Sequence, residues 1–147
     1  RSLLAGHRPR RPAPGSAVTP RVEAWIRQAN NDLEAAGLTA GQGFHAQACY
    51  LAGQAAEKAL KALVLAAGIT PPYSHSLEKL VELLQQQGLD LPALAELHLK
   101  ALTRMNSASR YPQGDEAPAD LFDANDSTTA LGTAEAVVRI AMAQLQA

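Results

Sequence analysis

The sequence lacks most of the features that mark disulfide-bonded, metal-binding and membrane-spanning proteins. It contains one cysteine, Cys49, in 147 residues, which excludes an internal disulfide and a cysteine-based zinc cluster. It has no uninterrupted apolar run of about 18 residues and no signal-peptide pattern, so it predicts a soluble, cytoplasmic protein without a membrane segment. A glycine-rich phosphate loop, an HExxH motif and a GxSxG motif are also missing, which removes the common signatures of nucleotide hydrolysis, metalloproteolysis and acyl transfer.

Aromatic residues are scarce as well, at 4% of the chain, whereas apolar residues of all kinds reach 47%. The core is therefore expected to be aliphatic and rich in alanine, as in helical bundles. No two of the histidines stand at a metal-binding spacing; they are His7, His45, His75 and His98. We therefore expect no metal and no cofactor.

The net charge of −1 conceals an uneven distribution of charge. Residues 1–20 contain four arginines and four prolines but no acid, which indicates a flexible, basic tail rather than a folded element. The rest of the chain holds nine basic and fourteen acidic groups, a net charge of −5. This balance excludes a wholly basic surface for nucleic acid, and any such surface has to be a local patch.

The chain is organised around the stretch 44–67, which has no proline and only one glycine, Gly53. Its residues are nearly all good helix formers, and its apolar positions cover most of the helix circumference. Such a helix is expected to be buried. Because it is apolar on more faces than one small bundle is expected to cover, it also predicts a homodimer.

Four further helices are expected from apolar residues at helical spacing and from capping signals. They are residues 22–36 after a Thr19-Pro20 cap, a helix capped by Ser74 or His75 and closed by Gly88, a helix from Pro92 to about Ser107, and a last helix capped by Asp123 or Asp126. No stretch alternates as a half-buried strand does. The sequence therefore predicts an all-α, up-and-down bundle of four or five helices over residues 21–147, preceded by the tail of residues 1–20.

Cations that interrupt or flank these apolar helices are the candidate ligand-binding residues. Lys58 and Lys61 are three residues apart and share a helix face. Because lysine is rarely buried without a partner, either an acid such as Glu57 neutralises them or they line a groove that an anion can enter. His75 stands at a helix start, where its ring either fixes the preceding loop or contacts a ligand.

A second group of candidates follows the predicted fourth helix. Arg104 lies in that helix, and Arg110 and Tyr111 follow it directly before Pro112, which holds Tyr111 in an extended conformation. An arginine beside a tyrosine can bind phosphate and stack on a base, and it can equally pin the loop to the bundle. The spacing alone leaves both interpretations open.

Four segments taken together resemble the HEPN domain, the nucleotide-binding domain of higher eukaryotes and prokaryotes. They are AWIRQANNDLEAA, YLAGQAAEKALKALVLAAG, SHSLEKLVELL and SRYP, and the resemblance extends over about residues 21–146. It implies a four- or five-helix bundle that usually forms a homodimer. Such domains are often encoded beside a minimal nucleotidyltransferase in a toxin–antitoxin-like pair, and many are metal-independent ribonucleases with an arginine followed four to six residues later by a histidine.

The chain departs from that ribonuclease motif. The arginine would be Arg104, but Ser109, Arg110 and Tyr111 occupy the window for the histidine, and no histidine follows His98. None of these three transfers protons at neutral pH as imidazole does, so we expect no ribonuclease activity. We interpret the protein as a nucleotide- or RNA-binding module with a nucleotidyltransferase partner. The predicted ligand-binding residues are Lys58, Lys61, His75, Arg104, Arg110 and Tyr111. The alternatives are a divergent ribonuclease toxin that uses Arg104 and Tyr111, and a helical interaction scaffold without a ligand.

Overall fold

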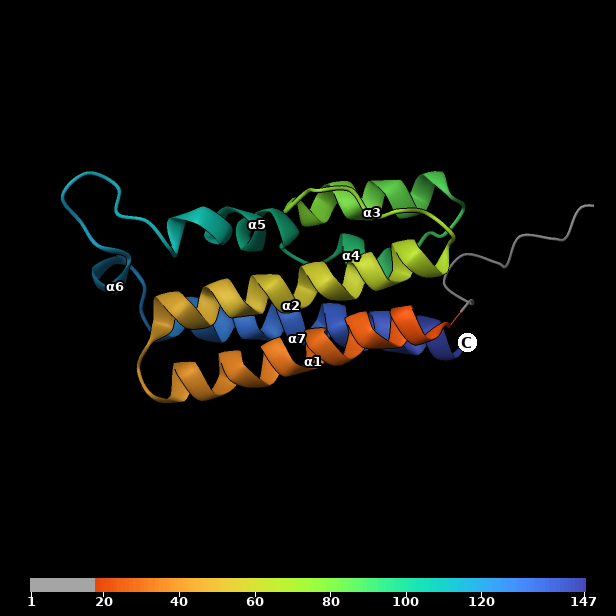
Figure 1. Cartoon of the computed structure of the whole chain (residues 1–147). Helices are drawn as coiled ribbons and strands as arrows, with labels where there is room; N and C mark the ends of the chain where they lie inside the picture. The colour runs from red at the N-terminus through yellow and green to blue at the C-terminus, as the bar shows by residue number, and fades with distance from the viewer. Residues whose placement is uncertain (1–17) are drawn as a thin grey trace, which may run out of the picture.

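The computed structural model describes residues 18–147, and this part of the chain is all-helical (Figure 1). The predicted tail, residues 1–20, lies almost wholly outside the described residues. The helices are α1 (Pro20–Gly41), α2 (His45–Ala66), α3 (Leu77–Gln86), α4 (Pro92–Ala95), α5 (Leu99–Ala108), α6 (Pro118–Leu121) and α7 (Ala124–Gln146). Over the described range, the only strand-like feature is an isolated bridge between Gln113 and Glu116. The predicted all-α bundle is confirmed.

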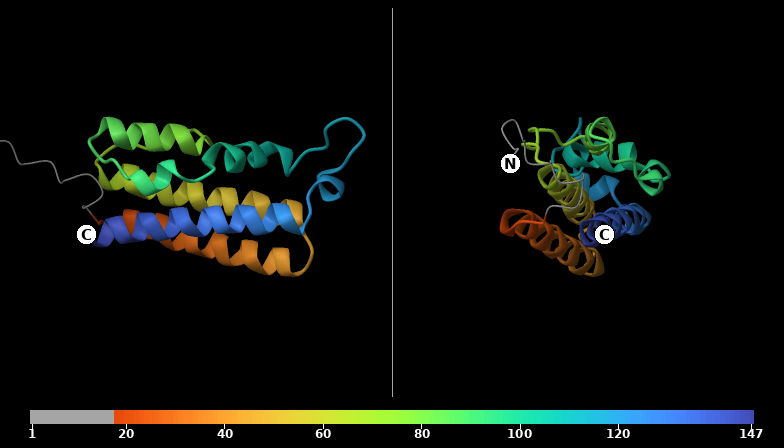
Figure 2. Two further views of the ribbon diagram at one scale, coloured as in Figure 1. Left: turned by 180° about the vertical axis from the view of Figure 1, so that it is seen from behind. Right: turned by 90° about the vertical axis from the view of Figure 1, so that its right-hand side faces the viewer.

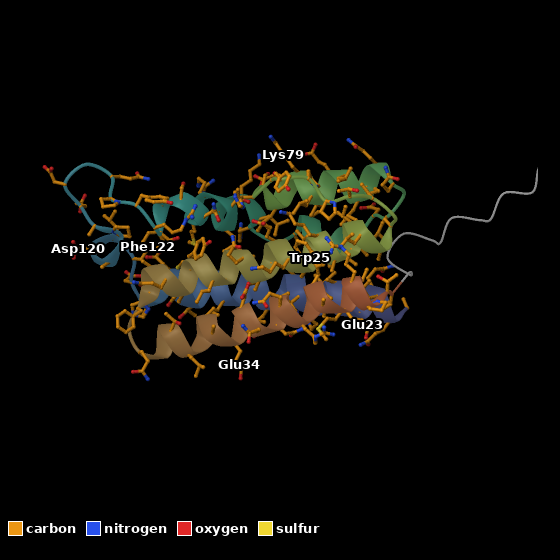
Figure 3. All side chains as sticks on the ribbon, in the orientation of Figure 1. Glu23, Trp25, Glu34, Lys79, Asp120 and Phe122 are labelled. Atoms are coloured by element: carbon orange, nitrogen blue, oxygen red, sulfur yellow. The ribbon has the colours of Figure 1, made fainter. Side chains whose placement is uncertain are left out.

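Three long helices, α1, α2 and α7, pack side by side, and the shorter helices complete the bundle above α2 (Figures 1 and 2). The helices α3 and α5 follow one another along α2 in the place of a fourth long helix, and both contact it. The bundle therefore has α2 at its centre, in contact with α1, α3, α5 and α7. Exposed charged residues lie around the outside, as Glu34 on α1 and Lys79 on α3 illustrate from opposite sides (Figure 3).

The central helix is buried by its own chain. Fourteen of its 22 residues are buried, and the alanines from Ala48 to Ala62 are fully covered. Small side chains let the neighbouring helices approach closely, and the larger residues Leu60 and Leu63 fill the remaining space. The expectation of a buried central helix is confirmed. The reason given for a homodimer is wrong, however, because one copy of the chain already covers most faces of α2.

Two helix starts follow the sequence closely. Thr19 caps α1 by accepting a hydrogen bond from the Val22 amide at 3.2 Å, and Pro20 takes the first helical position. Asp123 caps α7 in a reciprocal capping box, in which Asp123 accepts from the amide of Asp126 and the Asp126 side chain accepts from the amide of Asp123.

Two other expected boundaries are wrong. Ser76 rather than Ser74 or His75 caps α3, because the Ser76 hydroxyl accepts from the Lys79 amide while the Ser74 hydroxyl accepts from the Ser76 amide and shapes the turn. The helix α1 continues past Gly37 to Gly41, since Gly37 keeps helical geometry and the chain reverses only at Gly43, where φ is +88°.

The predicted helix from Pro92 to Ser107 is also wrong, because the chain breaks it into α4 and α5. Leu94 and Leu99 are both buried, at 1% and 6% exposure. On a continuous helix these two side chains would point about 140° apart, so only one would face the core. The turn at residues 96–98 brings both of them into it.

Candidate functional site

Arg110, just after the C-terminal end of α5, packs against two tyrosine rings. Its guanidinium carbon is 4.9 Å from the centroid of the Tyr50 ring, on α2, and 5.0 Å from that of Tyr111. Its Nε donates a 2.8 Å hydrogen bond to the Asn106 carbonyl, which fixes the guanidinium plane. Across residues 18–147 its two η nitrogens make no hydrogen bond, so the outer edge of the guanidinium is available to a ligand.

The end of α5 explains this geometry. The amides of Arg110 and Tyr111 both donate to the Ser107 carbonyl, at 3.0 and 3.2 Å, so the chain turns tightly after the helix. Pro112 then keeps Tyr111 out of the helical region. Tyr111 is 58% exposed, whereas Tyr50 is half-buried. The turn therefore brings one exposed ring and one half-buried ring into contact with the same cation.

An open cavity of about 380 Å³ adjoins Arg110; its lining residues are Gln47, Tyr50, Leu51, Ser109 and Arg110. A guanidinium edge suits the two oxygens of a phosphate, and an exposed tyrosine ring suits the face of a base. We call Arg110, Tyr50 and Tyr111 the Arg110 site.

A row of hydrogen bonds connects the Arg110 site to α1. The Gln54 amide donates to Asn106 Oδ1 at 3.2 Å, and Lys58 Nζ donates to Gln54 Oε1 at 3.4 Å. Lys58 also forms an ion pair with Asp32 of α1, and its side chain is 24% exposed. The row runs along the α2 face that meets α5. Lys58 is thus linked to the Arg110 site through two amides, but its charge is already neutralised by Asp32.

Glu57 joins two cationic groups in a separate cluster. Its carboxylate accepts hydrogen bonds from Lys61 Nζ at 2.9 Å and from His75 Nδ1 at 2.8 Å. The proton of the second bond is assigned to Nδ1, because a carboxylate only accepts. The side chains of Glu57 and Lys61 are only 8% and 10% exposed, whereas that of His75 is 62% exposed. The cluster compensates the buried charges of Glu57 and Lys61 on α2, and the contact with His75 ties the loop before α3 to that helix.

Arg104 lies elsewhere, in an open cleft of about 450 Å³ between α3 and the α4–α5 segment. Charged side chains from both helices share this cleft; they are Glu78, Glu82, Lys100 and Arg104. Leu77 opens α3 by donating its amide to Thr103 Oγ1 at 3.1 Å, so the two helices meet at this point. Arg104 and Tyr111 therefore line different surfaces.

The remaining polar groups offer little chemistry. Burial raises the pKa of the Cys49 thiol to about 12, with smaller contributions from the negative charges of Asp126 and Asp123, so this thiol is not a nucleophile. His45 Nδ1 is hydrogen-bonded to the Ser127 hydroxyl at 2.9 Å. In the part of the chain that the structure describes, no cluster of three His, Cys, Asp or Glu side chains is placed to hold a metal, and no helix is long and apolar enough to cross a membrane.

Comparison with known families identifies the fold. The family model of the HEPN domain matches residues 22–145, which is most of the chain. The chain belongs to the HEPN domain family. No curated protein sequence matches it.

Two solved structures resemble this HEPN domain over 86% of its length. The first is TT1696 from Thermus thermophilus, with 30% sequence identity and a TM-score of 0.79, all of whose chain is covered. The second is ST0689, an archaeal HEPN homologue, with 28% identity and a TM-score of 0.66, 98% of whose chain is covered. The resemblance to the HEPN domain is thus confirmed, and membership supports a nucleotide- or RNA-related module in general terms.

The residues predicted to bind ligand in this HEPN domain do not form one cluster. Arg110 and Tyr111 are in contact, and Lys58 is linked to them by hydrogen bonds. Lys61 and His75 meet on Glu57, while Arg104 lines the α3–α5 cleft. The sequence left two explanations for Lys58 and Lys61, neutralisation by an acid or exposure in an anion-binding groove. Neutralisation applies to both lysines, because each is paired with an acid. The binding role of the six residues stays a prediction.

Four residues of the Arg110 site and its polar row were not among the predicted ligand-binding residues; they are Tyr50, Gln54, Asn106 and Asp32. Tyr50 and Gln54 precede the predicted Lys58 at four-residue spacing on α2, and this stripe of polar groups on an apolar helix was a usable signal. Asn106 gave no such signal, since it stands among other polar residues near the end of α5. Asp32 lies on another helix, and only the packing of α1 against α2 brings it to Lys58.

Proposed function

We propose that this HEPN protein is a nucleotide- or RNA-binding module whose ligand binds at the Arg110 site. The observation that carries the proposal is Arg110 itself, held against Tyr50 and Tyr111 with the outer edge of its guanidinium open. That edge can take two phosphate oxygens while the exposed Tyr111 ring stacks on a base. Lys58 is hydrogen-bonded to Gln54 in the same polar row, but its charge is paired with Asp32, so Arg110 supplies the positive charge of the site.

Charge favours weak, salt-sensitive binding. Apart from the basic first 20 residues, the chain has a net charge of −5, so attraction for a polyanion has to come from a local positive charge such as that of Arg110. Phosphate contacts made at an exposed surface are strongly screened by salt. We therefore expect affinity to fall steeply between low and physiological salt.

The test is a fluorescence or calorimetric titration of the full chain with nucleotides and short single-stranded RNA at two salt concentrations. Replacing Arg110 with alanine, or Tyr111 with leucine, is expected to weaken binding by about tenfold, the loss of roughly one charged contact or one stacked base. Arg139→Ala on α7 and Tyr73→Leu are matched controls, because Arg139 is exposed and Tyr73 is an exposed tyrosine outside the Arg110 site. If the wild type and both site variants bind equally well, the ligand binds somewhere other than the Arg110 site.

The same samples test for catalysis. We expect no metal-independent RNA cleavage above background, because no histidine follows Arg104 in the position that the ribonuclease motif requires. The alternative of a divergent ribonuclease using Arg104 and Tyr111 gains no support from the geometry, since the two side chains line different surfaces. Cleavage that disappears in Arg104→Ala would nevertheless establish it. If no nucleotide or RNA binds even at low salt, the interaction-scaffold alternative replaces the binding module.

We further propose a homodimer and a minimal nucleotidyltransferase partner in a toxin–antitoxin-like pair, both of which rest on what the HEPN resemblance implies. Large exposed apolar side chains remain available for such contacts, among them Leu38 at 69% and Phe44 at 58% exposure, on either side of the turn between α1 and α2. Light scattering at micromolar concentration tests the dimer, and a clean monomer mass would contradict it. A neighbouring gene for a minimal nucleotidyltransferase, with co-purification of the two proteins, tests the partner.

A further inference from the structure

The cleft between α3 and the α4–α5 segment has the features of a small-ligand site apart from the Arg110 site. Its volume is about 450 Å³, within the range of pockets that hold small molecules. Its floor is apolar and is formed mainly by Val81, Leu94, Leu97 and Leu99. Leu94 and Leu99 are almost fully buried, so the floor is part of the packed core rather than a mobile surface.

The lining of the cleft also holds two rows of opposite charge, one on each helix. On α3, Glu78 and Glu82 are four residues apart, and on α5, Lys100 and Arg104 are four residues apart, so each pair occupies one helix face. Within residues 18–147, no ion pair of 4.0 Å or less joins the two rows. Each row therefore keeps its charge available to a ligand.

Glu78 is held in place as an ionised carboxylate. It accepts hydrogen bonds from the hydroxyls of Ser76, at 2.7 Å, and Thr103, at 2.9 Å. Partial burial works to raise the pKa of Glu78, but these hydrogen bonds, one from its own backbone amide and the positive charge of Lys100 together lower the pKa below its usual value. Glu78 is thus preorganised as the negative group of the cleft, and Lys100 is near enough for its charge to act on it.

We propose that this cleft binds a small zwitterion with an aliphatic body, of the class of a short apolar peptide. Its ammonium group lies against the carboxylates of Glu78 and Glu82, and its carboxylate lies against Lys100 and the guanidinium of Arg104. The aliphatic side chains cover Val81 and Leu97. A ligand with a single charge satisfies one row only, and a polyanion meets the repulsion of the α3 carboxylates, so this site is distinct in chemistry from the proposed nucleotide site.

The experiment is a titration of the ¹⁵N-labelled full chain with the dipeptide leucyl-leucine, followed by amide chemical shifts. We expect saturable shifts confined to residues 78–85 and 94–104. Acetyl-leucyl-leucine lacks the ammonium group and leucyl-leucinamide lacks the carboxylate, so each is expected to bind about fivefold more weakly, as for the loss of one exposed charge pair.

Variants test each row separately. Glu82→Gln is expected to weaken the binding of leucyl-leucine by about threefold to fivefold without changing the affinity for the acetylated dipeptide. Arg104→Met is expected to weaken the binding of leucyl-leucine by the same factor without changing the affinity for the amidated dipeptide. Lys79→Met and Glu96→Gln are controls, because both residues are exposed charges of the same segments outside the cleft lining; Lys79 is labelled in Figure 3. The amide spectra report whether each variant is folded.

Three results would overturn the proposal. They are the absence of saturable shifts with leucyl-leucine, shifts that map to Tyr50 and Arg110 instead, and binding of the two blocked dipeptides as tight as that of leucyl-leucine. A nucleotide titration of the same samples distinguishes the two proposals. Variants of the cleft are expected to leave nucleotide binding unchanged, whereas Arg110→Ala is expected to weaken it.

Discussion

Replacing Glu57 with alanine is expected to destabilise the bundle strongly, because it leaves a buried ammonium group without a partner. The carboxylate of Glu57 is 8% exposed and holds both Lys61 Nζ and His75 Nδ1. Without it, Lys61 retains a side chain that is only 10% exposed, and His75 loses the bond that ties its loop to α2. The His75 ring is largely exposed and can return to water, so Lys61 carries most of the cost.

The magnitude follows from the burial of Lys61. Removing one partner of a buried ion pair typically costs about 3–5 kcal/mol. Lysine has a long stem that can carry its ammonium group toward water, so the lower end, about 3 kcal/mol, applies to Glu57→Ala. Glu57→Gln keeps a hydrogen-bond acceptor but loses the charge, and about half that cost is expected. The double replacement Glu57→Leu with Lys61→Met removes both charges and is expected to recover most of the loss, because apolar residues of similar volume often replace buried ion pairs at little cost.

Urea unfolding followed by circular dichroism measures these differences as shifts in midpoint at constant slope. Glu34→Ala serves as the control, since Glu34 is an exposed acid on α1 and its loss is expected to stay within about 0.5 kcal/mol. A cost below about 1 kcal/mol for Glu57→Ala would refute the reasoning, because it would be no larger than that of an ordinary substitution. So would a double variant less stable than Glu57→Ala.

Two further predictions concern backbone conformation and capping. Gly37 is helical with open space around the position of a Cβ atom, whereas Gly88 has φ +88°. In urea unfolding, Gly37→Ala is therefore expected to stabilise the fold by about 0.5–1 kcal/mol and Gly88→Ala to destabilise it by about 1 kcal/mol. Stability changes of the same sign for the two variants would contradict this reasoning. A hydrogen bond from the backbone amide of Asp126 is the main cause that lowers the pKa of Asp123 below its usual value, and desolvation opposes it. The backbone amide of Asn125, the Asp126 side chain and the charge of His45 also lower this pKa. The folded state thus binds the proton more weakly than the unfolded state, so the contribution of Asp123 is present above the unfolded pKa and disappears as pH falls through the folded one. Thermal melts from neutral to acidic pH are expected to show a smaller decline for Asp123→Asn, which keeps a capping oxygen, than for the wild type.

Most of the fold was predictable because it depends on local signals. The caps at Thr19 and Asp123, and the alanine-rich stretch around Ala55, determine where helices begin and which one is buried. The break between α4 and α5 was not predictable, since Leu94, Leu97 and Ala101 follow the spacing of one face of a continuous helix. Only the burial of both Leu94 and Leu99 against the rest of the bundle favours the turn.

The candidate site was predictable only in part, for a related reason. Arg110 and Tyr111 are neighbours in sequence, so their contact needed only the turn before Pro112. Asp32 and Lys58 are 26 residues apart and meet through the packing of α1 on α2, which no local pattern encodes. The same holds for Tyr50 and Arg110, whose contact depends on where α5 crosses α2.

Gly53 faces α5 at that crossing. A Cβ atom built at this glycine would lie 3.8 Å from the Leu102 carbonyl oxygen and 3.9 Å from Leu102 Cδ1, which is ordinary contact distance. An alanine therefore fits there, but a larger side chain has to push α5 away from α2. Because Tyr50 and Gln54 flank Gly53, and Arg110 and Asn106 follow Leu102 on the facing segment, such a displacement separates both pairs without altering any of the four side chains. The Arg110 site thus depends on helix packing at Gly53 and not on the Arg-Tyr-Pro sequence alone.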